Sequence, residues 1–198
     1  SLSDQTVRPG KILINIPAFS KREQKGYEIP DFLLNHPLVE INETEEDLGP
    51  ATKLLPALKK YWGKKDFKLI IADDDEIYAE QLVENYLKYS DLSAKSVLTM
   101  VGWKVPPSGD HHERQVIFGA IGDKPKGSIE VSEPSQVDCV QGASTFMVRP
   151  TFFTDKVFDY STAPKEAFYV DDIYVSGRLA ENEIDIYFDR ATIDKIDN

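Results

Sequence analysis

Three consecutive carboxylates directly after a short apolar run constrain this chain more than any other feature of its sequence. Residues 69–72, Leu-Ile-Ile-Ala, have the composition of a buried strand, and Asp73, Asp74 and Asp75 follow at once. Adjacent carboxylates raise each other's pKa unless a positive charge lies between them. Their oxygens suit Mg²⁺ or Mn²⁺, which commonly bind one or two carboxylates together with substrate phosphates. The alternative is an acidic loop that begins the next helix, since aspartate is favourable in a first helical turn.

Apolar runs that alternate with helical patterns predict an α/β protein with a mixed central sheet flanked by helices. Strands are expected at 11–16, 38–42, 67–72, 95–101, 116–120, 129–131, 137–140, 146–148 and 184–188. Helices are expected over 52–62, with Pro56 in the first turns, over 77–89, and from 164 to 179. Residues 18–37 and 102–115 are predicted to be loops. In such sheets, ligands bind where strands end.

The composition restricts the classes of partner. With 198 residues, 41% of them hydrophobic, the chain can form one well-filled domain. A net charge of −11 disfavours nucleic acid and anionic membrane surfaces. No apolar run reaches 18 residues, so no membrane span is expected. The single cysteine, Cys139, fits a reducing compartment and is expected to be a buried thiol, and we expect a cytoplasmic monomer.

A nucleotide can bind so acidic a chain only through a metal and a few local cations. Lys53 is expected in the first turn of a helix that follows Gly49-Pro50, where the helix N-terminus and the ammonium both favour a diphosphate. Arg22, just beyond the first strand, could bind a phosphate or a base. The alternative for both side chains is a solvated surface cation.

Five segments together indicate a family. They are 14–17 (Ile-Asn-Ile-Pro), 47–53 (Asp-Leu-Gly-Pro-Ala-Thr-Lys), 73–75 (Asp-Asp-Asp), 141–146 (Gln-Gly-Ala-Ser-Thr-Phe) and 168–173 (Phe-Tyr-Val-Asp-Asp-Ile). In this order they resemble the metal-dependent glycosyltransferases of the GT-A fold, which carry a D-x-D signature. The resemblance covers residues 11–188. It implies that a hexose or deoxyhexose moves from a UDP-sugar to a sugar hydroxyl of a glycan, with Mn²⁺ or Mg²⁺ bridging the diphosphate.

The resemblance assigns roles to the three aspartates. In the family the last aspartate of D-x-D binds the metal directly, so Asp75 is the first expected ligand. Asp73 is the second expected ligand, because the first aspartate of the motif contacts the ribose, or contacts the metal through water. Asp74 would reach the donor sugar or cap the helix. Such a metal offsets the negative charge that develops on the leaving nucleotide.

Two further segments are implied to bind the donor. Ile16, Pro17 and Ala18 lie where the family seats the uracil base. Gly142 and Ala143 lie where it contacts the donor sugar, and small residues permit close backbone approach to a ligand. The alternative for this second segment is a β-bulge or a turn.

An acidic pair is implied beside the acceptor hydroxyl. In an inverting enzyme one carboxylate takes the acceptor proton as general base, for which Asp172 is preferred and Asp171 is the alternative. Either aspartate could instead be an acid in the first turn of a helix. The assignment has no basis if the enzyme retains the anomeric configuration.

The chain departs from some members of the family in its histidines, and it offers one aromatic candidate for sugar contact. Some GT-A enzymes supply a late histidine ligand, but this chain has no histidine after His112. Either two aspartates and waters hold the ion, or His111 or His112 contributes, unless their loop is simply polar and solvated. Trp103, at an expected strand end, is a candidate for sugar contact.

Two other functions stay open on the sequence. A nucleotidyltransferase that makes a nucleotide-sugar would usually carry a glycine-rich basic loop after the first strand, whereas residues 17–22 contain no glycine. A non-catalytic cation- or sugar-binding module would bind metal without UDP, but the D-x-[DN]-x-[DN]-G calcium loop is absent. The resemblance extends to viral members of the family. This implies an acceptor glycan on a capsid glycoprotein and a location in the host cytoplasm. The chain is short for a GT-A enzyme, so we expect either one domain of a longer polypeptide or a minimal version that lacks an acceptor module.

Overall fold

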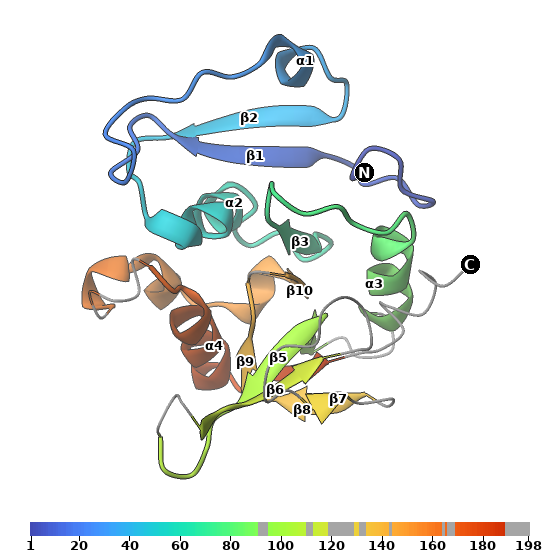
Figure 1. Ribbon diagram of the computed structural model, residues 1–198, viewed down its shortest axis with the longest axis vertical. Coiled ribbons are helices and arrows are strands. Elements are labelled where there is room, and N and C mark those ends of the chain that lie inside the picture. The colour runs from blue at the N-terminus through green and yellow to red at the C-terminus, as the bar shows by residue number, and fades with distance from the viewer. Residues whose placement is uncertain are drawn as a thin grey trace.

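A mixed β-sheet forms the centre of the fold. The computed structural model describes residues 1–90, 95–109, 113–118, 129–130, 134–142, 144–163, 165 and 169–188, and in this part the sheet has five strands in the order β3–β10–β4–β11–β8. The strands are β3 (Leu69–Ala72), β4 (Ser96–Thr99), β8 (Ser135–Val137), β10 (Thr145–Val148) and β11 (Asp185–Phe188). β4 and β11 are parallel, and the other neighbouring pairs are antiparallel. The prediction of an α/β protein with a mixed sheet is confirmed (Figure 1).

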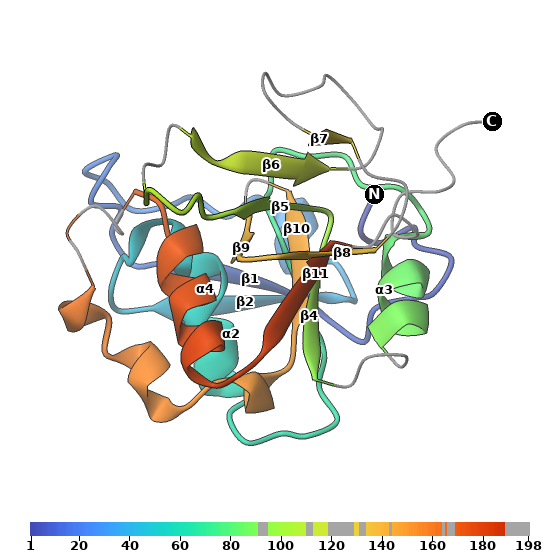
Figure 2. The same cartoon turned by 90° about the horizontal axis from the view of Figure 1, so that it is seen from below.

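Helices cover both faces of this sheet (Figure 2). α3 (Leu82–Ser90) packs on one face, and α2 (Leu55–Lys60) and α4 (Asp172–Glu181) cover the other. The alternation of side chains along each strand explains the two cores: Met147 of β10 belongs to the cluster under α3, and its neighbour Phe146 belongs to the cluster under α2 and α4. Burying an apolar side chain of this size contributes about 1.5–3 kcal/mol.

A second, smaller sheet lies beside the first because two strands bend out of the central sheet. In the described residues its order is β7–β6–β5–β9. The strands are β5 (Val101–Lys104), β6 (Gln115–Phe118), β7 (Ile129–Glu130) and β9 (Cys139–Val140). Met100 separates β4 from β5, and Asp138 separates β8 from β9, so each chain segment passes from one sheet to the other. A Cβ on Gly102 would lie 2.6 Å from a methyl carbon of Val137, so only glycine fits where the sheets meet.

The structure corrects the sequence prediction in this region. The chain from residue 102 was expected to be a loop, but β5 continues to Lys104, and the expected strand 137–140 is divided at Asp138. Trp103 is buried within β5, so its indole packs in the interior and offers no open face for sugar stacking. Cys139 is buried as expected, and burial raises the pKa of its thiol to about 11.

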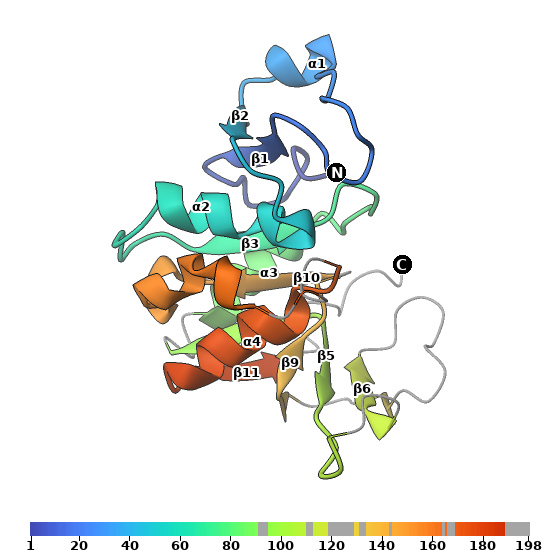
Figure 3. The ribbon, with the colours of Figure 1, turned by 90° about the vertical axis from the view of Figure 1, so that its left-hand side faces the viewer.

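β1 (Ile12–Pro17) and β2 (Val39–Thr44) form a separate parallel ribbon. The sequence predicted both strands but not that they form a sheet of their own, which shares no strand pairing with the central sheet in the described residues. The loop between them contains the short helix α1 (Asp31–Leu34). In Figures 1 and 3 the ribbon lies next to α2, on the side away from α4.

The helices begin later than the sequence suggested. The expected helix 52–62 is a 3₁₀ turn, Gly49–Lys53, followed by α2, which has Pro56 in its first turn, as predicted. α3 begins at Leu82 and not at 77, and α4 begins at Asp172 and not at 164. Further 3₁₀ turns span Pro150–Phe152, Asp155–Phe158 and Tyr160–Thr162. Among the described helices, none has the length and apolar character needed to cross a membrane.

Candidate functional site

Asp73 marks the edge of the sheet where the candidate site is found. Ala72, the last residue of β3, lies opposite Thr145, the first residue of β10, so the segments that flank these two strand ends meet. The Tyr78 hydroxyl accepts a hydrogen bond from the Asp73 backbone N–H (2.8 Å) and lies 3.4 Å from the Ser144 carbonyl oxygen. Tyr78 therefore holds the end of β3 against the loop that precedes β10.

Lys53 connects three segments at this edge. Its Nζ donates to Asp73 Oδ1 and to the Gly142 carbonyl oxygen, each at 2.8 Å. The side chains of Lys53 and Asp73 are only 19% and 26% exposed, so the pair is partly shielded from water. The Lys53 carbonyl oxygen accepts a hydrogen bond from Asn15 Nδ2 (3.1 Å), which ties the 3₁₀ turn to β1.

Asp172, the first residue of α4, lies on the other side of Gly142. Its Oδ1 accepts a hydrogen bond from the Gly142 backbone N–H at 2.7 Å. Burial and the neighbouring Asp171 raise the pKa of Asp172 to about 6. A Cβ on Gly142 would lie 2.6 Å from Asp172 Oδ1 and 2.9 Å from Lys53 Nζ, so the site requires glycine here.

Asp171 is the most buried carboxylate of the cluster, at 3% exposed. It occupies the N-cap position of α4 without a side-chain capping bond, and its Oδ2 has no hydrogen-bond partner in the described part of the chain. Burial raises the pKa of this carboxyl, and the charge of Lys53 opposes the rise. A buried acceptor without a donor is costly, so this carboxylate is held in place at the expense of stability.

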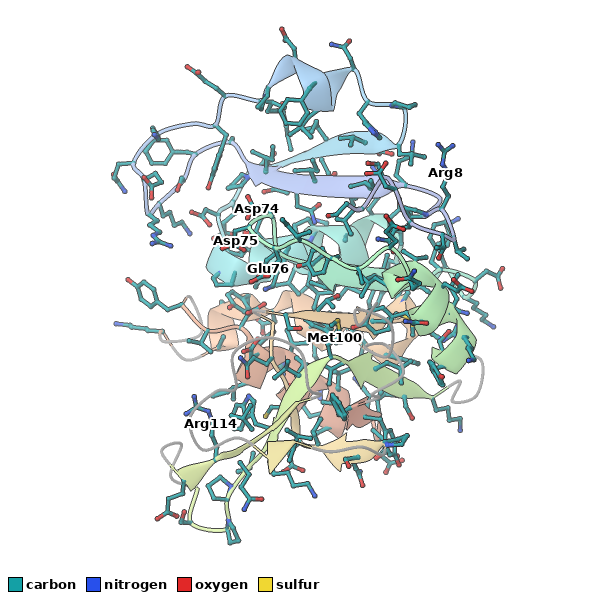
Figure 4. The ribbon with its side chains drawn as sticks, turned by 45° about the vertical axis from the view of Figure 1, so that its right-hand side comes forward. Arg8, Asp74, Asp75, Glu76, Met100 and Arg114 are labelled. Carbon is teal, nitrogen blue, oxygen red and sulfur yellow. The ribbon has the colours of Figure 1, made fainter. Side chains whose placement is uncertain are left out.

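The remaining acidic residues after β3 lie at the surface. Asp74, Asp75 and Glu76 are exposed, and Figure 4 shows them together at the side of the molecule, between the β1–β2 ribbon and the central sheet. The structure therefore pairs Asp73 with Lys53 and leaves Asp75, the first expected metal ligand, facing solvent.

The donor set at this edge fits a metal only together with a substrate. Within the described residues, no group of three or more histidine, cysteine, aspartate or glutamate side chains is arranged to hold an ion. Asp73 is paired with Lys53 and Asp75 is exposed, so the two carboxylates do not form a metal site by themselves. Mg²⁺ usually combines one or two carboxylates with water and substrate phosphates. The residues therefore suit a site completed by a diphosphate and do not form a closed protein site.

The expected uracil segment lies at the end of β1. Pro17 is buried, Ile16 is half-buried and Ala18 is exposed, with the Ala18 N–H donating to the Thr44 carbonyl oxygen at 2.8 Å. Arg22 projects into solvent, with its side chain 88% exposed and its Nε 3.9 Å from Glu23. The structure thus links this segment to the cluster through β1 and Asn15, whereas Arg22 has no described contact there. Ala143, His111 and His112 lie outside the described residues.

Sequence reasoning missed the polar side chains that support the site. Asn42 Nδ2 donates to Asn15 Oδ1 at 2.7 Å, which continues the connection from Lys53 across the ribbon. Asp47 is buried and accepts the backbone N–H groups of Lys21 (2.7 Å) and Gly49 (2.8 Å), which fixes the loop after β1 against the 3₁₀ turn. The signal was an asparagine inside each of two apolar strands, at paired positions.

Comparison with known proteins adds no assignment: no protein-family model matches the chain, and no curated protein matches it either.

Proposed function

We propose that this chain is a GT-A glycosyltransferase that moves a hexose or deoxyhexose from a UDP-sugar to a sugar hydroxyl of a glycan. The observation that carries the proposal is the meeting of Lys53, Asp73, Gly142 and Asp172 at one edge of the central sheet. Each comes from a different segment, and together they supply a cation, two carboxylates and a close-approach backbone position.

All five segments that carry the family resemblance are joined by hydrogen bonds. Asn15 donates to the Lys53 carbonyl oxygen, and Lys53 donates to Asp73 and Gly142. Gly142 in turn donates to Asp172. A resemblance carried by unrelated short matches would not require its segments to meet in space. Their convergence therefore supports one functional site.

Asp172 is suited to the role of general base. With its pKa raised to about 6, it is ionised at neutral pH and more basic than a solvated aspartate. The Gly142 N–H holds Oδ1, which leaves Oδ2 to take the proton from the acceptor hydroxyl in an inverting reaction. As that oxygen attacks the anomeric carbon, the bond from this carbon to the diphosphate oxygen breaks and UDP leaves. Asp171 Oδ2 is buried, so Asp171 would act on the reaction through its neighbour Asp172, whose pKa it helps to raise.

The donor would bind along the same edge. Lys53 provides the positive charge for the diphosphate, and the end of β1 at Ile16, Pro17 and Ala18 would hold the base. A divalent ion held by Asp73 and Asp75 would supply Lewis-acid stabilisation of the leaving diphosphate. Glycine at position 142 leaves the space that Asp172 Oδ1 and Lys53 Nζ occupy, so both side chains reach the backbone of the loop that would face the donor sugar.

The proposal is tested by titration calorimetry of the chain with UDP, in the presence and absence of Mn²⁺, with ADP and GDP as controls. We expect UDP to bind in a metal-dependent manner and more tightly than either purine nucleotide. Metal binding without nucleotide preference would favour a cation-binding module instead. Release of pyrophosphate from UTP and a sugar 1-phosphate would favour a nucleotidyltransferase.

A further inference from the structure

Lys53 places one positive charge beside three carboxylates. It pairs directly with Asp73, and of the described cations it is the one whose charge lowers the pKa of both Asp171 and Asp172. One ammonium opposes Asp73, Asp171 and Asp172, so the cluster carries an excess of negative charge. A second source of positive charge would be bound favourably.

The Lys53 ammonium occupies a position that a bound cation would need. Its Nζ lies 2.8 Å from Asp73 Oδ1 and 2.8 Å from the Gly142 carbonyl oxygen, two oxygen ligands of the kind that hard cations prefer. A divalent ion that binds Asp73 must therefore replace the ammonium or lie beside it. Two cations on one carboxylate repel strongly where water is partly excluded.

We infer that Lys53 is the counter-ion of Asp73 as long as no metal is bound. A divalent cation that binds Asp73 displaces the Lys53 ammonium, which is then released to bind the diphosphate of the nucleotide. This inference rests on the proposed function and deepens it, because it states how metal and nucleotide binding depend on each other. The same ammonium opposes the metal when the nucleotide is absent and stabilises the nucleotide when the metal is present.

Positive coupling between the two ligands follows. Without nucleotide the metal competes with Lys53, so it binds weakly. With a diphosphate present the displaced ammonium gains a new partner, so both ligands bind more tightly. Linkage requires that UDP strengthen Mn²⁺ binding by the same factor as Mn²⁺ strengthens UDP binding.

The test is titration of the whole chain with Mn²⁺ alone, followed by UDP, in the wild type and in Lys53→Met. We expect Lys53→Met to bind Mn²⁺ alone about three- to tenfold more tightly, because the competing charge is removed. The mutual strengthening of Mn²⁺ and UDP binding should fall towards a factor of one. Lys53→Arg keeps the charge and should keep both weak Mn²⁺ binding and coupling.

Lys60→Met is the matched control, because it removes one positive charge from a lysine whose Nζ lies 2.6 Å from Glu40, outside the cluster. It should leave Mn²⁺ binding as in the wild type. The Mn²⁺-induced rise in Tm gives a second readout, which should be larger in Lys53→Met than in the wild type even if that variant is less stable.

Unchanged or weaker Mn²⁺ binding in Lys53→Met would overturn the inference, as would an equal gain in Lys60→Met. If Mn²⁺ and UDP bind together in the wild type but Lys53→Met does not change Mn²⁺ binding, the inference fails and the proposed function stands. If the wild type binds neither ligand, both fail.

Discussion

At the scale of single residues, the peptide of Gly142 is the position on which the candidate site depends most. Asp172 accepts from its N–H, and Lys53 donates to its carbonyl oxygen, so both sides of this residue are held. Neither partner is near it in the sequence. The geometry therefore depends on α4 and the 3₁₀ turn Gly49–Lys53 being placed correctly around one loop.

Gly142→Ala is expected to lower UDP affinity in Mn²⁺ by about tenfold or more, because the new methyl group would collide with Asp172 Oδ1 and Lys53 Nζ. Calorimetry measures the change. Gly177→Ala is the control, since a Cβ there meets nothing within 4 Å and lies in α4, where alanine is a better helix former. Equal UDP affinity in both variants would remove Gly142 from the site.

The pH dependence of transfer tests Asp172. A base must be ionised, and its pKa is raised to about 6, so kcat/KM should fall as the pH drops through about 6. Asp172→Asn should bind UDP as the wild type does but lose most of the transfer rate. A profile that is flat between pH 5 and 8, or normal turnover in Asp172→Asn, would exclude this role.

The sequence could identify the acidic residues but could not separate their roles. Asp73, Asp74 and Asp75 are identical in type, and only the path of the chain after β3 determines which one faces Lys53. Burial distinguishes Asp171 from Asp172 in the same way, because the start of α4 decides which carboxylate lies inside. These distinctions depend on contacts between segments far apart in the chain, which no local pattern records.

At the scale of elements, α3 depends on a residue far from it in sequence. Gln5 Oε1 accepts the backbone N–H of Val83 (3.0 Å), in the first turn of α3, and Gln5 Nε2 donates to the Ala79 carbonyl oxygen (2.8 Å). The buried amide thus satisfies the Val83 N–H, as a capping residue next to the helix normally would, and also binds the segment before the helix.

Gln5→Ala should therefore lower the free energy of unfolding by about 1–2 kcal/mol. Urea denaturation measures the change. Gln136→Ala is the matched comparison. In the described contacts the Gln136 amide donates only to the exposed Asp185, so its removal should lower the free energy of unfolding by less than about 0.5 kcal/mol. Equal effects of the two substitutions would argue against the capping role.

The sequence predicted a strand or helix correctly where a local pattern sets its bounds, and incorrectly where contacts with distant segments set them. β1, β2, β3, β10 and β11 were each expected within about two residues of their bounds. β5 was missed because Gly102 interrupts the apolar pattern and because a bend at Met100 divides the expected strand. α3 was expected too early because its cap, Gln5, lies in a distant segment that the helical periodicity does not include.

At the scale of the whole molecule, a polar connection runs from the β1–β2 ribbon to the candidate site. Asn42, Asn15 and Lys53 form this connection, which ends at Asp73. The ribbon, which the resemblance assigns to the base of the nucleotide, is thereby oriented relative to the residues assigned to the diphosphate. Sequence patterns predicted the two strands of the ribbon and the residues of the candidate site, but not this connection between them.

Asn15→Ala should lower UDP affinity severalfold and the free energy of unfolding by about 1–2 kcal/mol, because it leaves the Lys53 carbonyl oxygen without its side-chain donor. Calorimetry and urea denaturation report the two effects. Asn35→Ala, at the exposed end of α1, should change neither substantially. Wild-type UDP affinity in Asn15→Ala would show that the ribbon does not orient the nucleotide.

The most direct test of the glycosyltransferase proposal is turnover of a panel of UDP-sugars in Mn²⁺, with release of UDP measured in the wild type and in Asp172→Asn. We predict that the wild type releases UDP from one donor class, that a glycan acceptor increases the rate, and that Asp172→Asn abolishes the increase. Equal release by both proteins, or none from any donor and acceptor despite UDP binding, would contradict the account.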